Sequence, residues 1–298
     1  MSSCSSPQVV VVNFYEIPRL FHLFAGILRE VPFKRVLLAV LPYLAYLVIF
    51  TFYSEIRSFT HLWEVSPPNY VILSNVEYQL FFCHPHQILS QLANPFFDFL
   101  AALPYLFHFP LPFLFGTFLA INPRRRPAFY PYVWCAGWVN LLAVLFQTLC
   151  PTAPPWFTDN TVFDQQGGIV YETPNEAGFR RFDKLIGFSL FHSIYAQAPI
   201  KFGSFPSLHI ALPVVILLNH PWFGKRVAAV HVVWIALAAM YSVHHYFIDV
   251  LGGISLVVIV RYCMLKIWSP FPELHELLRG EEELSQKTGA LQTAENIV

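Results

Sequence analysis

The sequence predicts an all-α, polytopic membrane protein with six transmembrane helices. The first observation is composition: 56% of the 298 residues are hydrophobic and only 12% are charged, whereas soluble domains carry about 25% charged residues. The second is a set of long apolar runs, and the third is the distribution of lysine and arginine between them. The formal net charge of +0 gives no basic surface, so we expect no nucleic-acid partner.

The apolar runs have the length needed to cross a bilayer, about 18–25 residues each. They lie near residues 36–53, 97–121, 129–149, 205–219, 226–243 and 246–267. We therefore expect an interfacial amphipathic segment over 1–35, a six-span membrane domain over 36–268 and a tail over 269–298. A tight turn near His244 has to join the last two runs.

Two longer connections link these runs. The stretch 54–96 alternates polar and aromatic residues and is expected to follow the membrane interface. The stretch 150–203 contains helix signals in "EAGFRRFDKLIGF". Connections of that length usually carry function, so we expect this one to form part of a site.

Lysine and arginine gather in alternate connections. They occur before the first run, in "RRR" at 124–126, at 225–226 and at the start of the tail. The positive-inside rule therefore predicts that both termini are cytoplasmic and that the stretch 150–203 is lumenal or external. The N-terminal sequence carries no basic segment followed by an apolar core, so we expect no cleaved signal peptide.

Two histidines and one aspartate fall at the lumenal ends of the last runs. His209 follows Ser207 at an expected helix N-terminus, where free N–H groups suit a phosphate. His245 and Asp249 are four residues apart and share one face of a helix. A carboxylate that holds one imidazole nitrogen protonated leaves the other as a nucleophile or base. The set predicts covalent phosphoryl transfer.

The alternative is that each histidine is a structural hydrogen-bonding group, the commoner case for one histidine near an interface. Three such groups at helix starts on one face favour the chemical interpretation. His244 is interpreted as structural or as an edge of the substrate site. The remaining histidines of the membrane domain form no constellation that predicts a role; they are His84, His86, His108, His220 and His231. No carboxylate cluster predicts a metal, and no cofactor is expected.

The motifs "FPSLH" and "HHYFID" resemble motifs two and three of the type 2 phosphatidic acid phosphatase superfamily. The resemblance is closest to its inositol phosphorylceramide synthases, through "LFHFPLPFLFG", "FQTLCPTAPPWF", "RFDKLIG", "FGSFPSLH" and "YSVHHYFIDVLGG", over roughly residues 90–265. It implies a phosphatase-like helical core with the site between spans three, four and six. It also implies that His245 is the nucleophile, Asp249 orients it and His209 is the acid and base.

The chain departs from the phosphatase pattern where cations are expected. Leu119 occupies the position of the motif-one lysine, and Ala238 and Ala239 occupy that of the serine–arginine pair. The one Arg–Pro pair, Arg126–Pro127, lies on the predicted cytoplasmic side. A phosphodiester carries one negative charge where a monoester carries nearly two, so fewer cations favour a diester substrate.

Several residues are expected to contact the substrate. Arg181, Lys184 and Lys201 are candidates to replace the lost cations, with nonspecific lipid contacts or pairing to nearby carboxylates as the alternative. Ser207 is a candidate for binding phosphate. Trp156 is a further candidate: the interfacial aromatic belt is the favoured interpretation, and stacking on a sugar of the substrate is the alternative.

The resemblance implies a transferase that moves phosphoinositol from phosphatidylinositol to ceramide. It also implies a Golgi membrane location and a small regulatory membrane subunit, as in some members of the family. Three alternatives stay open: a lipid phosphatase or phospholipase with the same His–His–Asp set, a sphingolipid synthase with another headgroup, and a non-catalytic scaffold.

Overall fold

The computed structural model describes residues 33–159, 175–200, 202–219, 224–266 and 270–271. The chain divides into two compact units, Met1–Leu38 and Ala39–Val298. Only the first six residues of α2 (Phe33–Thr51) represent the first unit among the described residues. The expected interfacial segment and tail therefore lie almost wholly outside the described residues.

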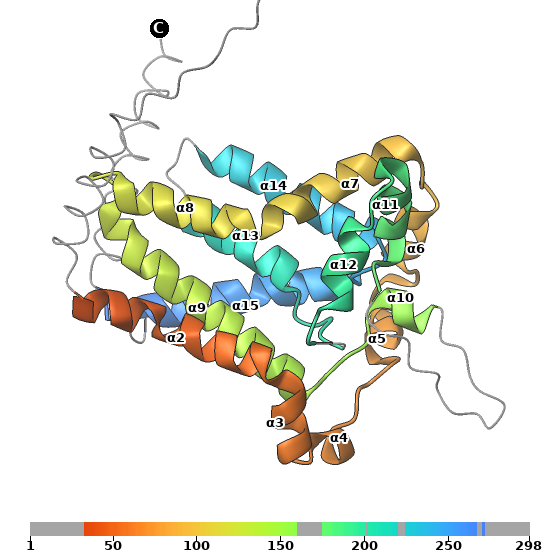
Figure 1. Ribbon diagram of the computed structural model, residues 1–298, viewed down its shortest axis with the longest axis horizontal. Coiled ribbons are helices and arrows are strands. Elements are labelled where there is room, and N and C mark those ends of the chain that lie inside the picture. The colour runs from red at the N-terminus through yellow and green to blue at the C-terminus, as the bar shows by residue number, and fades with distance from the viewer. Residues whose placement is uncertain (1–32, 160–174, 201, 220–223, 267–269, 272–298) are drawn as a thin grey trace, which may run out of the picture. The chain divides into compact units, whose positions relative to one another are not determined.

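The second unit is helical throughout its described part, as the sequence predicts, with two isolated β-bridges and no strand in the described ranges. Its long helices are α7 (Pro95–His108), α8 (Pro110–Ile121), α9 (Arg126–Leu149), α13 (Leu208–Asn219), α14 (Lys225–Tyr241) and α15 (Phe247–Lys266). Helix α13 packs against α7, α8, α9, α14 and α15, and Figure 1 shows it within this group. It is therefore the central helix of the bundle.

Three described helices are long and apolar enough to span a membrane: α2, α9 and α15. Helices α7 and α8, which are bent by 49° at their junction, make a fourth if they form one span. The run expected at 205–219 is helical only over the 12 residues of α13, or about 18 Å. Helices thus occupy all six predicted apolar runs. Among the described helices, however, only three, or four if the bent pair counts as one span, are long and apolar enough to cross a membrane.

Short helices fill both long connections. The first connection holds α3 (Tyr53–Phe59), α4 (Leu62–Val65), α5 (Ile72–Phe81) and α6 (Pro85–Ser90). The second holds α10 (Pro155–Thr158), the 3₁₀ helix η1 (Ala177–Phe179), α11 (Arg180–Ile186) and α12 (Leu190–Ala196). The helix signal in "EAGFRRFDKLIGF" is thereby confirmed.

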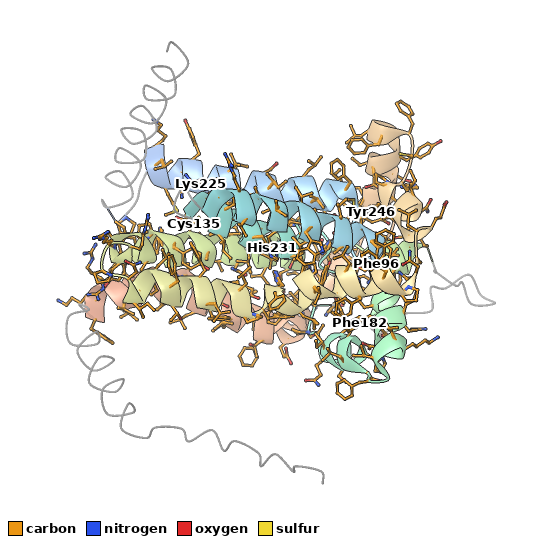
Figure 2. All side chains as sticks on the ribbon, turned by 90° about the horizontal axis from the view of Figure 1, so that it is seen from above. Phe96, Cys135, Phe182, Lys225, His231 and Tyr246 are labelled. Carbon is orange, nitrogen blue, oxygen red and sulfur yellow. The ribbon has the colours of Figure 1, made fainter. Side chains whose placement is uncertain are left out.

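Both connections lie at one end of the bundle. Figure 2 shows Lys225, which begins α14, at the other end from Tyr246, which directly precedes α15, and Figure 1 shows α10, α11 and α12 beside the C-terminal end of α14. The short basic segments at 124–126 and 225 are thus far from the histidine site. The tight turn expected near His244 is present, because α14 ends at Tyr241 and α15 begins at Phe247.

Candidate active site

Asp249 sits in the first turn of α15 and organises the turn before it. Its Oδ2 accepts a hydrogen bond from the backbone N–H of Tyr246 at 2.9 Å. This is the bond that an acidic residue three positions into a helix makes in a capping box. The same oxygen lies 3.3 Å from Nδ1 of His245. Asp249 therefore both caps the helix and holds the imidazole.

The sequence places His245 on the helix, and this expectation is wrong. His245 lies two residues before α15, in a turn where Val243 has a φ of 61°. The two side chains still meet because the capping bond folds the turn back over Asp249. A third donor, the Ser204 hydroxyl, reaches Asp249 Oδ2 at 2.6 Å, and the Asp249 side chain is fully buried.

His209, in the first turn of α13, completes the row. Its Nδ1 lies 3.0 Å from Nε2 of His245. With the His245 proton on Nδ1, toward Asp249, Nε2 carries the lone pair and the His209 Nδ1–H donates to it. A phosphorus atom attacked by Nε2 has to enter between these two nitrogens. The pair must therefore separate when a phosphate binds.

Close backbone packing brings the two histidine-bearing segments together. A Cβ on Gly253 would lie 2.5 Å from the carbonyl oxygen of Ser207, so only glycine lets α15 approach the start of α13 this closely. The Ser207 N–H donates to the carbonyl of Asp249 at 3.2 Å. Gln147 of α9 donates to the carbonyls of Gly203 and Pro206, which fixes the turn from the other side.

A mostly apolar cavity of about 240 Å³ opens onto the two histidines. Its wall comes from α2, α7, α9, α10, α12, α13 and the turn before α15. Aromatic residues contribute much of it, among them Tyr46, Tyr105, Trp156 and Tyr195. No lysine or arginine of the described residues lines it. An apolar chamber with two convergent imidazoles suits a lipid whose charge is small.

His244 also lines the cavity, beside the catalytic candidates. Its Nδ1 lies 3.0 Å from the Ser242 hydroxyl, and its ring contacts Tyr195 and Phe179. Burial, together with repulsion from His245, lowers the pKa of His244 to about 3. His244 is therefore a neutral group in the cavity wall at physiological pH.

The residues expected to contact the substrate differ in where they lie: one lines the cavity, others do not, and one is outside the described residues. Trp156 is buried and lines the cavity, so its assignment to the interfacial aromatic belt is wrong. Ser207 is buried, and its Oγ has no hydrogen-bond partner among the described residues. Arg181 pairs with Asp98, Nε to Oδ1 at 2.7 Å, and Lys184 is exposed on α11; neither lines the cavity. Lys201 lies outside the described residues.

Sequence reasoning missed three neighbours of the histidine pair. Ser204 bonds Asp249, and the Tyr105 and His108 rings lie 4.6 and 4.8 Å from the His209 ring. His108 had a signal, because a histidine inside an apolar run is costly in a membrane and needs a reason. Ser204 and Tyr105 had none, since serine and tyrosine are common where a helix starts or faces a core.

The family of the chain is decided by a match to a family model. The model of the PAP2 superfamily matches residues 71–263, a range that contains His209, His245 and Asp249. The chain belongs to the PAP2 superfamily, in the branch of the inositol phosphorylceramide synthases. No solved structure was found to match the chain significantly.

Relatives from fungi and a bacterium place this PAP2 chain in that branch. It is 32% identical to the inositol phosphorylceramide synthase catalytic subunit of Schizosaccharomyces pombe, over 74% of this chain and 55% of that protein. It is 31% identical to the phosphoinositol dihydroceramide synthase of Bacteroides thetaiotaomicron, over 82% of this chain and 81% of that protein. The chain thus spans little more than half of the fungal relative and most of the bacterial one.

Proposed function

We propose that the protein transfers phosphoinositol from phosphatidylinositol to the primary hydroxyl of ceramide. The observation that carries the proposal is the row Asp249–His245–His209, joined at 3.3 and 3.0 Å and open to an apolar cavity. The names of the relatives supply the transferred group and the ceramide-type acceptor, and phosphatidylinositol as the donor is part of the proposal.

The first step forms a phosphohistidine. Nε2 of His245 attacks the phosphorus of phosphatidylinositol, and the bond from phosphorus to the glycerol oxygen breaks. His209 gives a proton to that oxygen, so diacylglycerol leaves as an alcohol. Asp249 keeps the His245 proton on Nδ1 and stabilises the positive charge that develops on the ring.

The second step moves the phosphoinositol to the acceptor. His209 takes the proton of the ceramide hydroxyl, and that oxygen attacks the phosphohistidine. The phosphorus–nitrogen bond breaks, and His245 returns to its starting state with inositol phosphorylceramide released. Neither step draws on a metal or a cofactor, since both protons and both leaving groups are accounted for by the two histidines.

The shortage of cations supports a diester substrate. Ala239, at the position where the phosphatases carry a cation, is fully buried, and its carbonyl accepts from the N–H groups of His244 and His245. A long, charged arginine side chain at this fully buried position would have no room without a rearrangement of the surrounding residues. Burying the single negative charge of a diester in such a site costs less free energy than burying the nearly two charges of a monoester.

Within this proposal, the headgroup contacts are two buried groups, Trp156 in the cavity wall and Ser207, two positions before His209. Trp156 offers a ring face for the inositol, and Ser207 offers a hydroxyl at the N-terminus of α13, where backbone N–H groups favour a phosphate. Arg181 and Lys184 lie on α11, in the connection beside the site, and we propose that they and Lys201 attract the anionic lipid as it approaches.

The membrane arrangement follows the same proposal. Six spans, with α13 and α14 as two of them, would put both termini in the cytoplasm and the histidines at the lumenal face. We propose a Golgi membrane and a small regulatory membrane subunit, the latter because the fungal relatives are named catalytic subunits.

The proposal is tested with purified protein, fluorescent ceramide and either phosphatidylinositol or another phospholipid. We expect a phosphoinositol–ceramide product with phosphatidylinositol alone, and its loss in His245→Ala. His231→Ala is the matched control, since this histidine lies in the middle of α14 and does not line the cavity.

Each of the other possible outcomes would contradict a different part of the proposal. Diacylglycerol without a ceramide product would make the protein a hydrolase. A ceramide product from another donor would change the headgroup. Full activity in His245→Ala would overturn the proposed nucleophile.

A further inference from the structure

A second polar cluster lies outside the active site, at the turn between α5 and α6. Glu77 of α5, His84 before α6 and His86 within α6 bring one ligand atom each to within 4.8 Å of one another. The turn closes at Phe82, whose φ of 57° reverses the chain. From this cluster we propose that Glu77, His84 and His86 bind a zinc ion that fixes the turn carrying His245.

The spacing of the ligand atoms fits a tetrahedral ion. Glu77 Oε2 lies 3.2 Å from Nδ1 of His84 and 3.4 Å from Nδ1 of His86. Zinc bonds of about 2.0–2.1 Å at tetrahedral angles put neighbouring ligand atoms about 3.3–3.4 Å apart. His84 is the partly exposed member, with 18% of its side chain accessible, so it can turn to close the third edge and leave a fourth position for water.

The ring nitrogen of His86 that faces the proposed ion has Glu77 Oε2 3.4 Å away, at ion-pair distance. His86 is fully buried, yet its Nδ1 makes no hydrogen bond within the part of the chain that the structure describes. A buried ring nitrogen that makes no hydrogen bond is costly. Its other nitrogen, Nε2, lies 3.2 Å from Asp159 Oδ2. A carboxylate on the second nitrogen is the usual partner of a metal-bound histidine, because it fixes the tautomer and the ring orientation.

The negative charges of the two carboxylates in this cluster also favour a bound cation. Glu77 is fully buried, and among the described residues neither it nor Asp159 pairs with a lysine or arginine. A buried carboxylate needs a positive charge beside it, and here that charge has to come from the two imidazoles or from an ion bound between them. One Zn²⁺ balances the two carboxylates with both imidazoles neutral, which is the form that binds metal.

The cluster is joined to the active site by one hydrogen bond. Glu77 Oε1, the oxygen that does not face the histidines, accepts from the N–H of Phe247 at 2.6 Å. Phe247 is the first residue of α15, two positions after His245, and the His86 ring packs edge-on against Tyr246 at 5.1 Å. A zinc ion that fixes Glu77 therefore fixes the turn that aims His245. The ion would thus position His245 without contacting the substrate. This inference holds whichever lipid binds at the active site.

The test is the zinc content of the full chain, purified in detergent without chelator. We expect about one zinc per chain, and rebinding of zinc after removal by a strong chelator, with a rise in apparent melting temperature. In Glu77→Gln and His86→Asn, zinc affinity should fall at least about tenfold, the range seen when ligands or their partners are lost.

The matched control is the pair His61 and Glu64 in the same connection. These two are exposed and 3.9 Å apart, and no third ligand joins them within the described part of the chain, so His61→Asn and Glu64→Gln should leave zinc binding unchanged. Wild-type protein that holds no zinc in micromolar excess of the ion would overturn the site, whether or not the variants fold. Zinc that binds without raising the melting temperature, or whose removal leaves kcat unchanged, would overturn the positioning role.

Discussion

At the scale of single residues, Asp249 Oδ2 is the point on which the active site converges. It accepts from Ser204 Oγ and Tyr246 N and lies beside His245 Nδ1. The carboxylate thus sets the position of a helix end and, with the same atom, the tautomer of His245, the proposed nucleophile. Weakening any of these contacts should change the chemistry more than the binding of lipid.

Ser204→Ala tests this point. It removes a 2.6 Å hydrogen bond to a buried carboxylate while leaving all three candidate catalytic groups in place. We expect kcat to fall about tenfold with KM nearly unchanged, since a bond to a charged group contributes roughly 1.5–3 kcal/mol and part of it is recovered by relaxation. Ser193→Ala, an exposed serine on α12, is the control. A rise in KM at constant kcat would instead place Ser204 in lipid binding.

His244 predicts how stability changes with pH. Its pKa is about 3 in the folded protein, because it is buried and near His245, and about 6.5 in an unfolded chain. As the pH falls below about 6.5, His244 becomes protonated in the unfolded chain but stays neutral in the folded protein. The free energy of unfolding therefore falls, by at most about 1.4 kcal/mol per pH unit from this residue.

Melting curves in detergent at pH 7 and pH 5 measure this effect. The apparent melting temperature of the wild type should drop between the two, and that of His244→Gln should drop less, since glutamine does not titrate. Equal drops in the two proteins would show that His244 is accessible to protons in the folded state.

The sequence predicts the chemistry of the site better than its surroundings. His209, His245 and Asp249 are found because charged and imidazole groups at membrane ends are unusual. Ser204 and Gln147 are missed because their roles depend on which turns meet in space, at Asp249 and at Gly203. The pairing of Arg181 with Asp98 is missed for the same reason, since 83 positions separate the two residues.

At the scale of elements, the site depends on how closely α15 approaches the start of α13. Gly253→Ala would place a Cβ 2.5 Å from a backbone oxygen, Ser207 O, which has no flexible side chain to yield. We expect a separation of His209 from His245 and a loss of most transferase activity. Gly116→Ala in α8 is the control, since its Cβ would meet nothing closer than 3.4 Å.

Activity and apparent melting temperature, measured together, separate the possible causes. A loss of activity with little change in melting temperature supports a local shift of the histidines. An active Gly253→Ala protein would contradict the claim that this contact sets the geometry of the site.

The length of a helix is a feature that the apolar pattern of the sequence does not predict. The apolar run at 205–219 predicts a span, but its first residues form a turn and the helix starts only at Leu208. Helix α13 is enclosed by five other helices, so its length is set by protein contacts and not by the bilayer. Apolar composition alone does not distinguish a helix buried in protein from one that faces lipid.

At the scale of the whole molecule, the two ends of the bundle differ in charge and in content. One end carries the segments 124–126 and 225, and the other carries the histidines and the short helices of both long connections. The positive-inside rule assigns the first end to the cytoplasm. This arrangement would admit donor and acceptor lipids from the lumenal leaflet.

Cysteine accessibility in sealed vesicles prepared from the membrane that holds the protein tests the assignment. In a cysteine-free background, Gln197→Cys on the exposed C-terminal edge of α12 and Arg124→Cys in the basic segment mark the two ends. Intact vesicles keep their cytoplasmic face outward. A membrane-impermeant thiol reagent should therefore label Arg124→Cys at once and Gln197→Cys only after detergent is added. The reverse pattern would invert the topology and put the histidines in the cytoplasmic leaflet, whereas labelling of both before detergent would mean that the bundle does not separate the two ends across a membrane.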